Sequence, residues 1–461
     1  MFVLEMITAQ EVRHNARLRD HMIELELVGL ALAGAVAGAV LGLVPGLHVY
    51  NVAGALVLAA AAGRLPLSGE ALALGMAGMV VGWAMSNAIP AVFLFAPDDA
   101  SAGAILPATR YMLQGRGAEA VLLMGAGSLA ALVALAALAP ALDEILRPLR
   151  AIVQAHTGWM LMAIIAFLLL GEWPRVDAVP GASPGRRLAR AWAWLGAGLL
   201  TFTLSGLLGL VLMTRSPIPA DMAFQNLLPA FVGLFALPGL VQVGLFGGAL
   251  PTQRWPERLD LPPALWARGA LTGLAGGLFA GFLPVISGGI GGLLAGHATA
   301  QRDERLFLVS QGASKIVYYA GSLLLLFVPG LALTRGGMAW MLTTIVVPTG
   351  WRSYALAVAA LALGGAVAFW LLIVFTRAAA RLAPRLNPRA LAIGAAVIAV
   401  ALVGAFTGGP GLFVAAVATP IGLIPVLVGG RRLNALGVLL LPITLNAIGM
   451  GPDVARLLGL N

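Results

Sequence analysis

Long apolar runs separated by short polar connectors make up almost the whole of this chain. Runs of about 20 apolar residues match the hydrocarbon core of a bilayer, which is roughly 30 Å thick. Two of the runs, 49–63 and 287–300, are too short to span. They are predicted to be half-helices or re-entrant segments, which are tolerated only where protein or a water-filled cavity surrounds them. The pattern predicts an all-α, polytopic integral membrane protein with about 10 to 14 membrane segments.

A stripe of glycines that ends in a proline occurs twice along the chain. The pattern G-x3-G-x3-G-x2-P is formed by Gly34, Gly38, Gly42 and Pro45 and, 239 residues later, by Gly273, Gly277, Gly281 and Pro284. A glycine stripe alone lets two helices approach closely, so helix packing is one interpretation. A stripe that ends in proline, is followed by a short polar segment and recurs in both halves indicates a transporter site at a repeat interface.

The repeat divides the chain into four parts. They are a polar N-terminal lead-in at 1–24, a first transmembrane half at 25–213, a connecting segment with a membrane helix at 214–268, and a second transmembrane half at 269–461. We predict two related halves that are inverted relative to each other, each with a broken or re-entrant helix hairpin. The lead-in is charged and lacks the apolar core of a cleaved signal peptide.

Composition supports the membrane class and removes several others. The chain of 461 residues is 60% hydrophobic and only 10% charged, whereas about a quarter of the residues of a soluble domain are charged. The formal charge of +9 comes from arginines in short loops such as 175–190 and 377–389. This distribution indicates membrane topology rather than a nucleic-acid partner. We expect a multi-pass protein of the cytoplasmic, or inner, membrane.

Enzyme chemistry finds little support in the sequence. The chain has no cysteine, which excludes thiolate metal sites and thiol nucleophiles. It has no H-E-x-x-H motif, and its histidines are not at metal-ligand spacing. The stretch "ISGG" at 286–289 lacks the strand–turn–helix setting of a nucleophile elbow. We expect neither an enzyme nor a bound cofactor or metal.

The first break, "GLVPGLHVYNVAGAL" at 42–56, is predicted to bind an anion. Pro45 should stop or kink the helix, because proline has no N–H and clashes with the preceding turn. A half-helix that begins near Gly46 would point free N–H groups and a positive dipole end inward, where carboxylates bind. His48, Tyr50 and Asn51 could add donors. Alternatively, His48 and Tyr50 are interfacial anchors and Asn51 is a helix N-cap.

The second break follows Pro284 and is rich in small residues. Ser287, Gly288 and Gly289 leave backbone N–H groups accessible, much as an anion-binding nest does. The two breaks together are predicted to hold the substrate at the interface of the halves.

Lys315 is the only lysine of the chain, against 27 arginines, and lies within an apolar segment beside Ser314 and Tyr318. An ionisable residue inside a membrane segment is costly and indicates function. Lys315 could be a fixed cation that binds an anionic substrate together with Ser314 and Tyr318. Because lysine can lose its proton when desolvated, it could instead replace a sodium ion, which would make transport proton-linked or uncoupled. A third interpretation is that it snorkels to a membrane boundary.

Four further polar residues are candidates, with Lys315, for coupling an ion to transport. Asp98 and Asp99 follow a proline and could bind a cation or, equally, cap the next helix. Ser86 and Asn87 lie in the middle of an apolar segment, where buried polar groups need partners. They could contact the ion or the substrate, or they could join two helices.

Three stretches of this sequence resemble a known family of permeases. The stretches are "GLVPGLHVYNVAGAL" at 42–56, "AVFLFAPDDASAGAILPATRYMLQGRGAEAV" at 91–121 and "GFLPVISGGIGGLL" at 281–294. In this order they resemble the large permease subunit of tripartite tricarboxylate transporters, the TctA family. The stretch at 419–445 is similar to a divergent, archaeal-type branch. In the second break Val285 stands where the family signature has the glycine of P-G.

The resemblance implies a secondary active transporter for small organic anions, such as dicarboxylates and tricarboxylates, driven by a Na⁺ or H⁺ gradient. It also implies a small membrane subunit and an extracytoplasmic solute-binding protein as partners. A homodimer is left open. The alternatives are an ion or solute channel and a membrane scaffold without transport activity.

Overall fold

The computed structural model describes residues 23–460 apart from 174–182, 220–224, 247, 249, 332 and 349. The predicted lead-in at 1–24 lies almost wholly outside the described residues. Within the described part of the chain all regular structure is helical, with no strand. The all-α prediction is confirmed.

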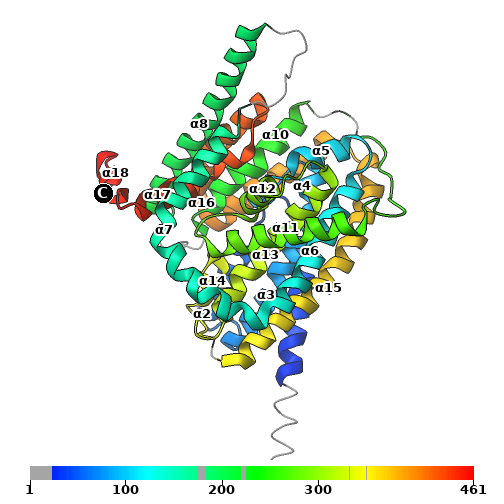
Figure 1. Ribbon diagram of the computed structural model, residues 1–461, viewed down its shortest axis with the longest axis vertical. Coiled ribbons are helices and arrows are strands. Elements are labelled where there is room, and N and C mark those ends of the chain that lie inside the picture. Colours follow the sequence, from blue (N-terminus) through cyan, green and yellow to red (C-terminus); the bar gives the residue numbers. More distant parts are fainter. Residues whose placement is uncertain are drawn as a thin grey trace, which may run out of the picture.

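The helices follow one another along the whole chain (Figure 1). The first half contains a helix at Ile23–Leu41, then α2 (Val49–Ala61), α3 (Gly69–Ser86), α4 (Ala88–Phe93), α5 (Ile105–Leu113), α6 (Gly117–Leu138), η1 (Ala139–Ala141), α7 (Leu142–Leu170) and α8 (Pro184–Thr214). The middle segment contains α9 (Leu228–Phe231), the π-helical turn η3 (Val232–Ala236) and α10 (Leu237–Phe246). The second half contains α11 (Pro263–Phe282), α12 (Gly288–Ala298), α13 (Glu304–Phe327), α14 (Gly336–Leu342), α15 (Gly350–Leu382), η4 (Ala383–Arg385), α16 (Pro388–Val428), η5 (Arg432–Leu436), α17 (Gly437–Ala447) and α18 (Gly451–Leu457).

The described residues contain seven helices that are long and apolar enough to cross a bilayer. The number rises to eight if the bent pair Arg432–Ala447 and Gly451–Leu457 forms one span. This is fewer than the 10 to 14 segments expected from the apolar runs, about 20 residues being enough for one crossing. Part of the difference arises because Gly117–Leu170, with 54 residues, and Pro388–Val428, with 41, each count once. The second of these is interrupted at Gly408, which has non-helical dihedral angles.

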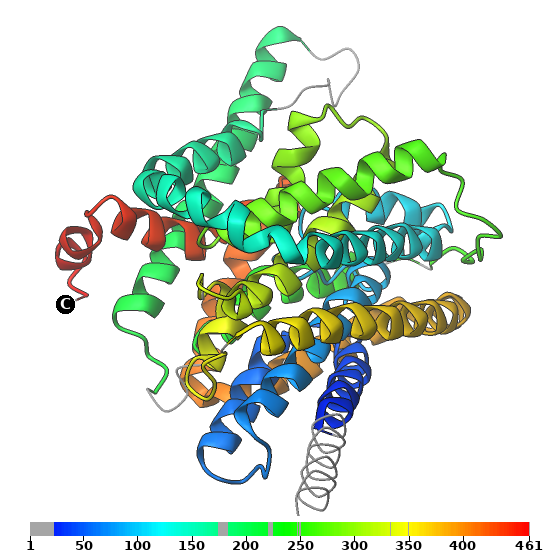
Figure 2. The ribbon, with the colours of Figure 1, turned by 60° about the horizontal axis from the view of Figure 1, so that its bottom comes forward.

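Helix α13 lies at the centre of the fold. It packs against α11, α6, α12 and α3, while α15 crosses the outer side of α3 and α6 (Figure 1). From Leu308 to Phe327 every residue of α13 except Tyr318 is buried. A second group of helices, in which α8 packs on α17 and α16 packs on α10, flanks this core (Figure 2). The candidate residues of the second half are therefore surrounded by protein.

The two predicted breaks are present and adopt matching conformations. The helix Ile23–Leu41 is followed by α2 after a break, and α11 is followed by α12 in the same way. The residue after each proline has a positive φ, which is 79° at Gly46 and 56° at Val285. The N-caps of α2 and α12 are His48 and Ser287, which are 239 residues apart, as the repeat requires. The inversion of the two halves in the membrane remains a prediction.

Replacing Val285 by glycine is expected to raise the free energy of unfolding by about 1 kcal/mol. A β-branched residue held in the left-handed region costs about 1–3 kcal/mol, whereas glycine adopts that region readily. Unfolding of the purified protein in detergent would measure the change. The matched control is Ile286→Gly, since Ile286 is fully buried and is not among the residues with positive φ. Destabilisation of similar size in both variants would show that Val285 is not strained.

The glycine stripes let the helices on either side of each break pack closely. A Cβ atom added to Gly38 would lie 2.0 Å from the carbonyl oxygen of Met79 in α3. A Cβ atom added to Gly273 would lie 2.3 Å from the carbonyl oxygen of Ser310 in α13. Neither distance leaves room for a side chain. The packing interpretation of the stripes is therefore confirmed, and it holds together with the breaks rather than in place of them.

Candidate functional site

The two breaks meet at the segment 94–104, between α4 and α5. On one side, His48 at the start of α2 lies 3.8 Å from a carboxylate oxygen of Asp99. On the other side, Ser287 at the start of α12 donates to the carbonyl oxygen of Asp99 over 3.4 Å. The middle of α13 lies against the same segment, because Lys315 contacts Asp98. Residues from four distant parts of the sequence thus form one cluster.

Lys315 is fully enclosed at the centre of this cluster. Its ammonium donates to Ser101 Oγ over 2.7 Å, to Asn87 Oδ1 over 2.8 Å and to Asp98 Oδ1 over 3.1 Å. It also lies 5.3 Å from the ring centroid of Trp83, within range of a cation–π contact. The side chain is 3% exposed. Its three donors are used inside the protein, so the snorkelling interpretation of Lys315 is wrong.

Tyr319 joins His48 to both aspartates. Its hydroxyl lies 3.1 Å from His48 Nε2, 3.1 Å from Asp98 Oδ2 and 3.3 Å from Asp99 Oδ1. The backbone N–H of Tyr50 donates to His48 Nδ1, so in the neutral ring the proton is on Nε2 and points to Tyr319. The hydroxyl of Tyr319 then has one proton to donate to Asp98 or Asp99. The arrangement forms a continuous hydrogen-bonded path from His48 to Lys315.

Asp98 and Asp99 do not cap the next helix. The N-cap of α5 is Ala104, and Asp98 instead accepts a hydrogen bond of 2.9 Å from the backbone N–H of Ser101, within the preceding turn. Of the two alternatives weighed from the sequence, the helix-cap interpretation is wrong. Ligand atoms of His48, Asp98 and Asp99 lie within 4.8 Å of one another, close enough to hold a cation together. A cavity of about 30 Å³ borders all three.

The predicted residues of the first break separate into two groups. Gly46 and His48 border the small cavity beside the aspartates, and Pro45 lies in the break itself. Tyr50 and Asn51 line another cavity of about 240 Å³, which His48 also borders. Asn51 donates to Gln225 over 2.8 Å and is not the N-cap of α2, a position that His48 occupies. Because His48 is buried, it is also not an interfacial anchor.

The predicted residues of the second break mainly hold α12 on α13. Ser314 donates to the carbonyl oxygen of Gly288 over 2.7 Å, and a Cβ atom added to Gly288 would lie 2.8 Å from the Cα of Lys315. A Cβ atom added to Gly289 would likewise lie 2.8 Å from the carbonyl oxygen of Ala100. Pro284 lies in the break, next to Val285. These residues determine how near the aspartate segment can come to Lys315.

Two of the predicted residues lie beside the cluster without a bond to its charges. The Tyr318 ring packs on the ring of Tyr319, with 4.9 Å between centroids. Ser86 is buried next to Asn87, and its hydroxyl has no hydrogen-bond partner among the described residues.

Three residues of the cluster were not predicted from the sequence, although signals for them exist. Tyr319 lies four residues after Lys315, on the same face of α13, whereas Tyr318 is one position further round. Trp83 lies four residues before Asn87, and its indole N–H donates to the carbonyl oxygen of Leu47 in the first break over 2.8 Å. Ser101 lies three residues after Asp98, and its backbone N–H donates to the Asp98 carboxylate.

Broken helices that meet at a buried set of charges, deep in a bundle of membrane-spanning length, define a polytopic membrane protein of the transporter class. The sequence model of the Tripartite tricarboxylate transporter TctA family matches residues 28–437. The chain belongs to this family, as the resemblance in its motifs predicts.

A curated relative supports the archaeal-type branch. An uncharacterized protein of Methanocaldococcus jannaschii is 27% identical over 321 residues, which cover 68% of this chain and 72% of that protein. No solved structure matches the chain.

Proposed function

We propose that the protein is a secondary active transporter of small organic anions of the dicarboxylate and tricarboxylate class, driven by a Na⁺ or H⁺ gradient. Membership in the TctA family supports the class of activity. The observation that carries the proposal is the buried Lys315 cluster, placed where the two broken helices meet. The substrate is held between these breaks, with the N-terminal ends of α2 and α12 directed at its negative charge.

The charges of the cluster suggest how an ion is coupled to the substrate. Lys315 is paired with Asp98, so its ammonium is not free to bind a carboxylate. A cation bound by Asp98 and Asp99, which lie close together beside His48, would neutralise the aspartates. The ammonium of Lys315 would then be available for the substrate. A proton delivered to the aspartates would have the same effect, since it removes negative charge from the same place.

The tripartite nature of the family adds partners to the proposal. A small membrane subunit and an extracytoplasmic solute-binding protein would deliver the anion to this chain in the cytoplasmic membrane.

Uptake by proteoliposomes tests the proposal directly. Purified protein would be reconstituted, and uptake of labelled succinate and citrate would be followed under an imposed Na⁺ gradient or pH gradient. We expect saturable uptake, driven by one of the two gradients, and counterflow of labelled substrate. Flux without saturation or counterflow would indicate a channel, and absence of flux both with and without the two partner proteins would indicate a scaffold.

Replacing Tyr319 by phenylalanine is expected to reduce gradient-driven uptake about 10- to 100-fold. The variant removes the hydroxyl that joins His48 to both aspartates, and proton-transfer or positioning groups commonly contribute effects of this size. The matched control is Tyr318→Phe, because the neighbouring hydroxyl makes no bond to the aspartates. Uptake should stay within about twofold in the control. Equal rates for the two variants would contradict the role of Tyr319.

A further inference from the structure

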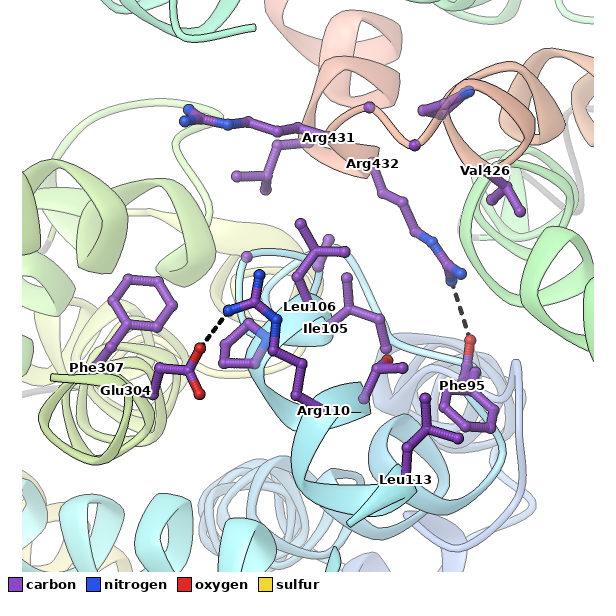
Figure 3. A pocket seen from close by; sticks show the side chains of 18 of the residues that line it. Phe95, Ile105, Leu106, Arg110, Leu113, Glu304, Phe307, Val426, Arg431 and Arg432 are labelled. Atoms are coloured by element: carbon purple, nitrogen blue, oxygen red, sulfur yellow. Dashed lines mark hydrogen bonds and ion pairs between the residues drawn. The ribbon is translucent and has the colours of Figure 1, made fainter. Parts of the chain in front are cut away.

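A second cavity, of about 790 Å³, lies beyond the segment that carries the aspartates. Phe95 and Gly103 line this cavity, whereas 96–99 line the small cavity of the Lys315 cluster. The segment is therefore a wall between the two spaces. Further walls come from α5, α10, α12, the start of α13, the end of α16 and η5, several of which Figure 3 shows. The volume of this second cavity is within the usual range of ligand sites, about 300–1,000 Å³. We call this space the Arg432 cavity.

The charged side chains around the Arg432 cavity are mostly basic. They are Arg110, Arg302, Arg431 and Arg432, with Asp303 and Glu304 as the two carboxylates. Both carboxylates are already ion-paired, since Glu304 contacts Arg110 and Asp303 contacts Arg305. Figure 3 shows Arg110 directed at Glu304 and Arg432 directed at the backbone of Phe95. The lining thus has an excess of positive charge.

Arg432 is buried in this wall without a negative partner among the described residues. Arg432 is 8% exposed. Its guanidinium donates to the carbonyl oxygen of Phe95 over 3.0 Å and to Gln242 Oε1 over 3.5 Å. Both acceptors are neutral, and none of the carboxylates that the structure describes forms an ion pair with it. A buried charge without a counter-charge is destabilising. A group that the fold retains at such a cost is suited to binding an anion.

The fold also makes room for this arginine. A Cβ atom added to Gly239 in α10 would lie 3.0 Å from the Arg432 Nη1 atom and 2.0 Å from the carbonyl oxygen of Phe95. Glycine at 239 therefore allows the guanidinium and the carbonyl to meet. The side chains of Ile105, Leu106 and Phe307 supply an apolar surface in the same cavity.

We propose that the Arg432 cavity is a binding site for an organic carboxylate, distinct from the Lys315 cluster, and that Arg432 binds the carboxylate group. A guanidinium can donate two parallel hydrogen bonds to one carboxylate, a geometry that an ammonium lacks. The apolar side chains contact the carbon skeleton of the ligand. The ligand class rests on the proposed transport function, whereas the site itself rests on the unpaired guanidinium and the cavity.

Binding here would act on the Lys315 cluster through one hydrogen bond. Phe95 has a φ of 56°, in the left-handed region that a bulky residue adopts only under strain. Its carbonyl oxygen accepts from Arg432, and Asp98 is three residues further along. A carboxylate that replaces the Phe95 carbonyl as the acceptor of the guanidinium removes this hydrogen bond from the segment. Occupancy of the Arg432 cavity therefore changes how firmly Asp98 is held against Lys315.

The absence of cysteine from the chain provides a specific test. Leu106 lines the cavity and is 53% exposed, so Leu106→Cys introduces a single accessible thiol. The rate of maleimide labelling would be measured in purified protein at increasing concentrations of succinate or citrate. We expect the anion to slow the labelling. Adding Arg432→Gln should raise the concentration for half-maximal protection at least about tenfold, equivalent to 1.4 kcal/mol.

Three controls make the result specific to Arg432. Leu457→Cys in α18, which is 86% exposed and outside the cavity, should show no protection by the anions. Arg302→Gln removes an exposed arginine of the same cavity and should change protection less than about threefold. Arg432→Lys keeps the positive charge but lacks the planar guanidinium, so its effect on protection should be intermediate. The same variant tests the site if Arg432→Gln does not fold.

The outcomes separate this inference from the proposed function. Protection that is unchanged by Arg432→Gln and Arg432→Lys, or the absence of protection at Leu106→Cys while uptake is measurable, overturns the site and leaves transport standing. Protection that depends on Arg432 in a protein without uptake leaves the site standing and overturns the proposed transport. Loss of both protection and uptake in the protein with native Arg432 overturns both.

Discussion

Replacing Lys315 by methionine is expected to abolish uptake and to lower the free energy of unfolding by about 3–5 kcal/mol. Methionine keeps most of the length of the side chain but leaves Asp98 buried without its cation. The acceptors Asn87 Oδ1 and Ser101 Oγ lose their donor at the same time. Unfolding in detergent would measure stability, and proteoliposome uptake would measure function.

The double variant Lys315→Met, Asp98→Asn separates stability from transport. It leaves no unpaired charge at this position, so most of the lost stability should return while uptake remains absent. A double variant as unstable as the sum of the two single changes would argue against a direct pair. Normal affinity and coupling in the single Lys315→Met variant would remove Lys315 from the mechanism.

Lys315→Arg distinguishes the two roles that the sequence leaves open. Arginine retains the positive charge but does not release its proton. If Lys315 acts as a fixed cation, the arginine variant should keep part of its uptake. If Lys315 must release a proton in each cycle, the arginine variant should fold and bind but should not turn over.

The second large effect is expected from Gly38→Ala in the helix Ile23–Leu41. The added methyl group would lie 2.0 Å from the carbonyl oxygen of Met79 and within 2.8 Å of its Cα. These are backbone atoms of α3 and cannot rotate away, so the two helices must separate. We expect the free energy of unfolding to fall by about 3 kcal/mol or more. The change would be measured as a lower unfolding temperature and a smaller monodisperse fraction.

Gly29→Ala is the matched control for this prediction. Gly29 lies in the same helix, and a Cβ atom added there meets nothing within 4 Å. Alanine in a helix should be neutral or should stabilise by about 0.5–1 kcal/mol relative to glycine. Equal stability of the Gly38 and Gly29 variants would show that the stripe does not determine the helix packing.

The breaks were predictable because their causes are local. Proline disfavours a continuous helix, and Pro45 and Pro284 follow a glycine stripe with the same spacing. Proline alone is not sufficient, since Pro148, Pro420 and Pro442 lie inside helices. The number of membrane segments was less predictable, since one long helix and two short ones leave similar apolar patterns.

Most residues of the site were predicted from the sequence, but the hydrogen bonds and ion pairs between them were not. Lys315 was identified because a lone lysine in an apolar run is costly, but its partner Asp98 is 217 residues away. No local pattern specifies such a pairing. For the same reason the pairing of Asn51 with Gln225, 174 residues away, was not predicted. Tyr319 was missed and Tyr318 was chosen in its place, although helical phase puts Tyr319, four residues after Lys315, on the same face of α13.

The burial of α13 has a consequence for how the protein is made. This helix is buried over almost its whole length, yet it is not among the described helices that are apolar enough to cross a membrane unaided. A lysine at the centre of an inserting helix costs about 2.5–3.5 kcal/mol at the translocon. Helices α3 and α6, which pack against α13, precede it in the chain. They leave the ribosome before α13 does. The polar helix α13 can therefore pack against protein, rather than lipid, as it enters the bilayer.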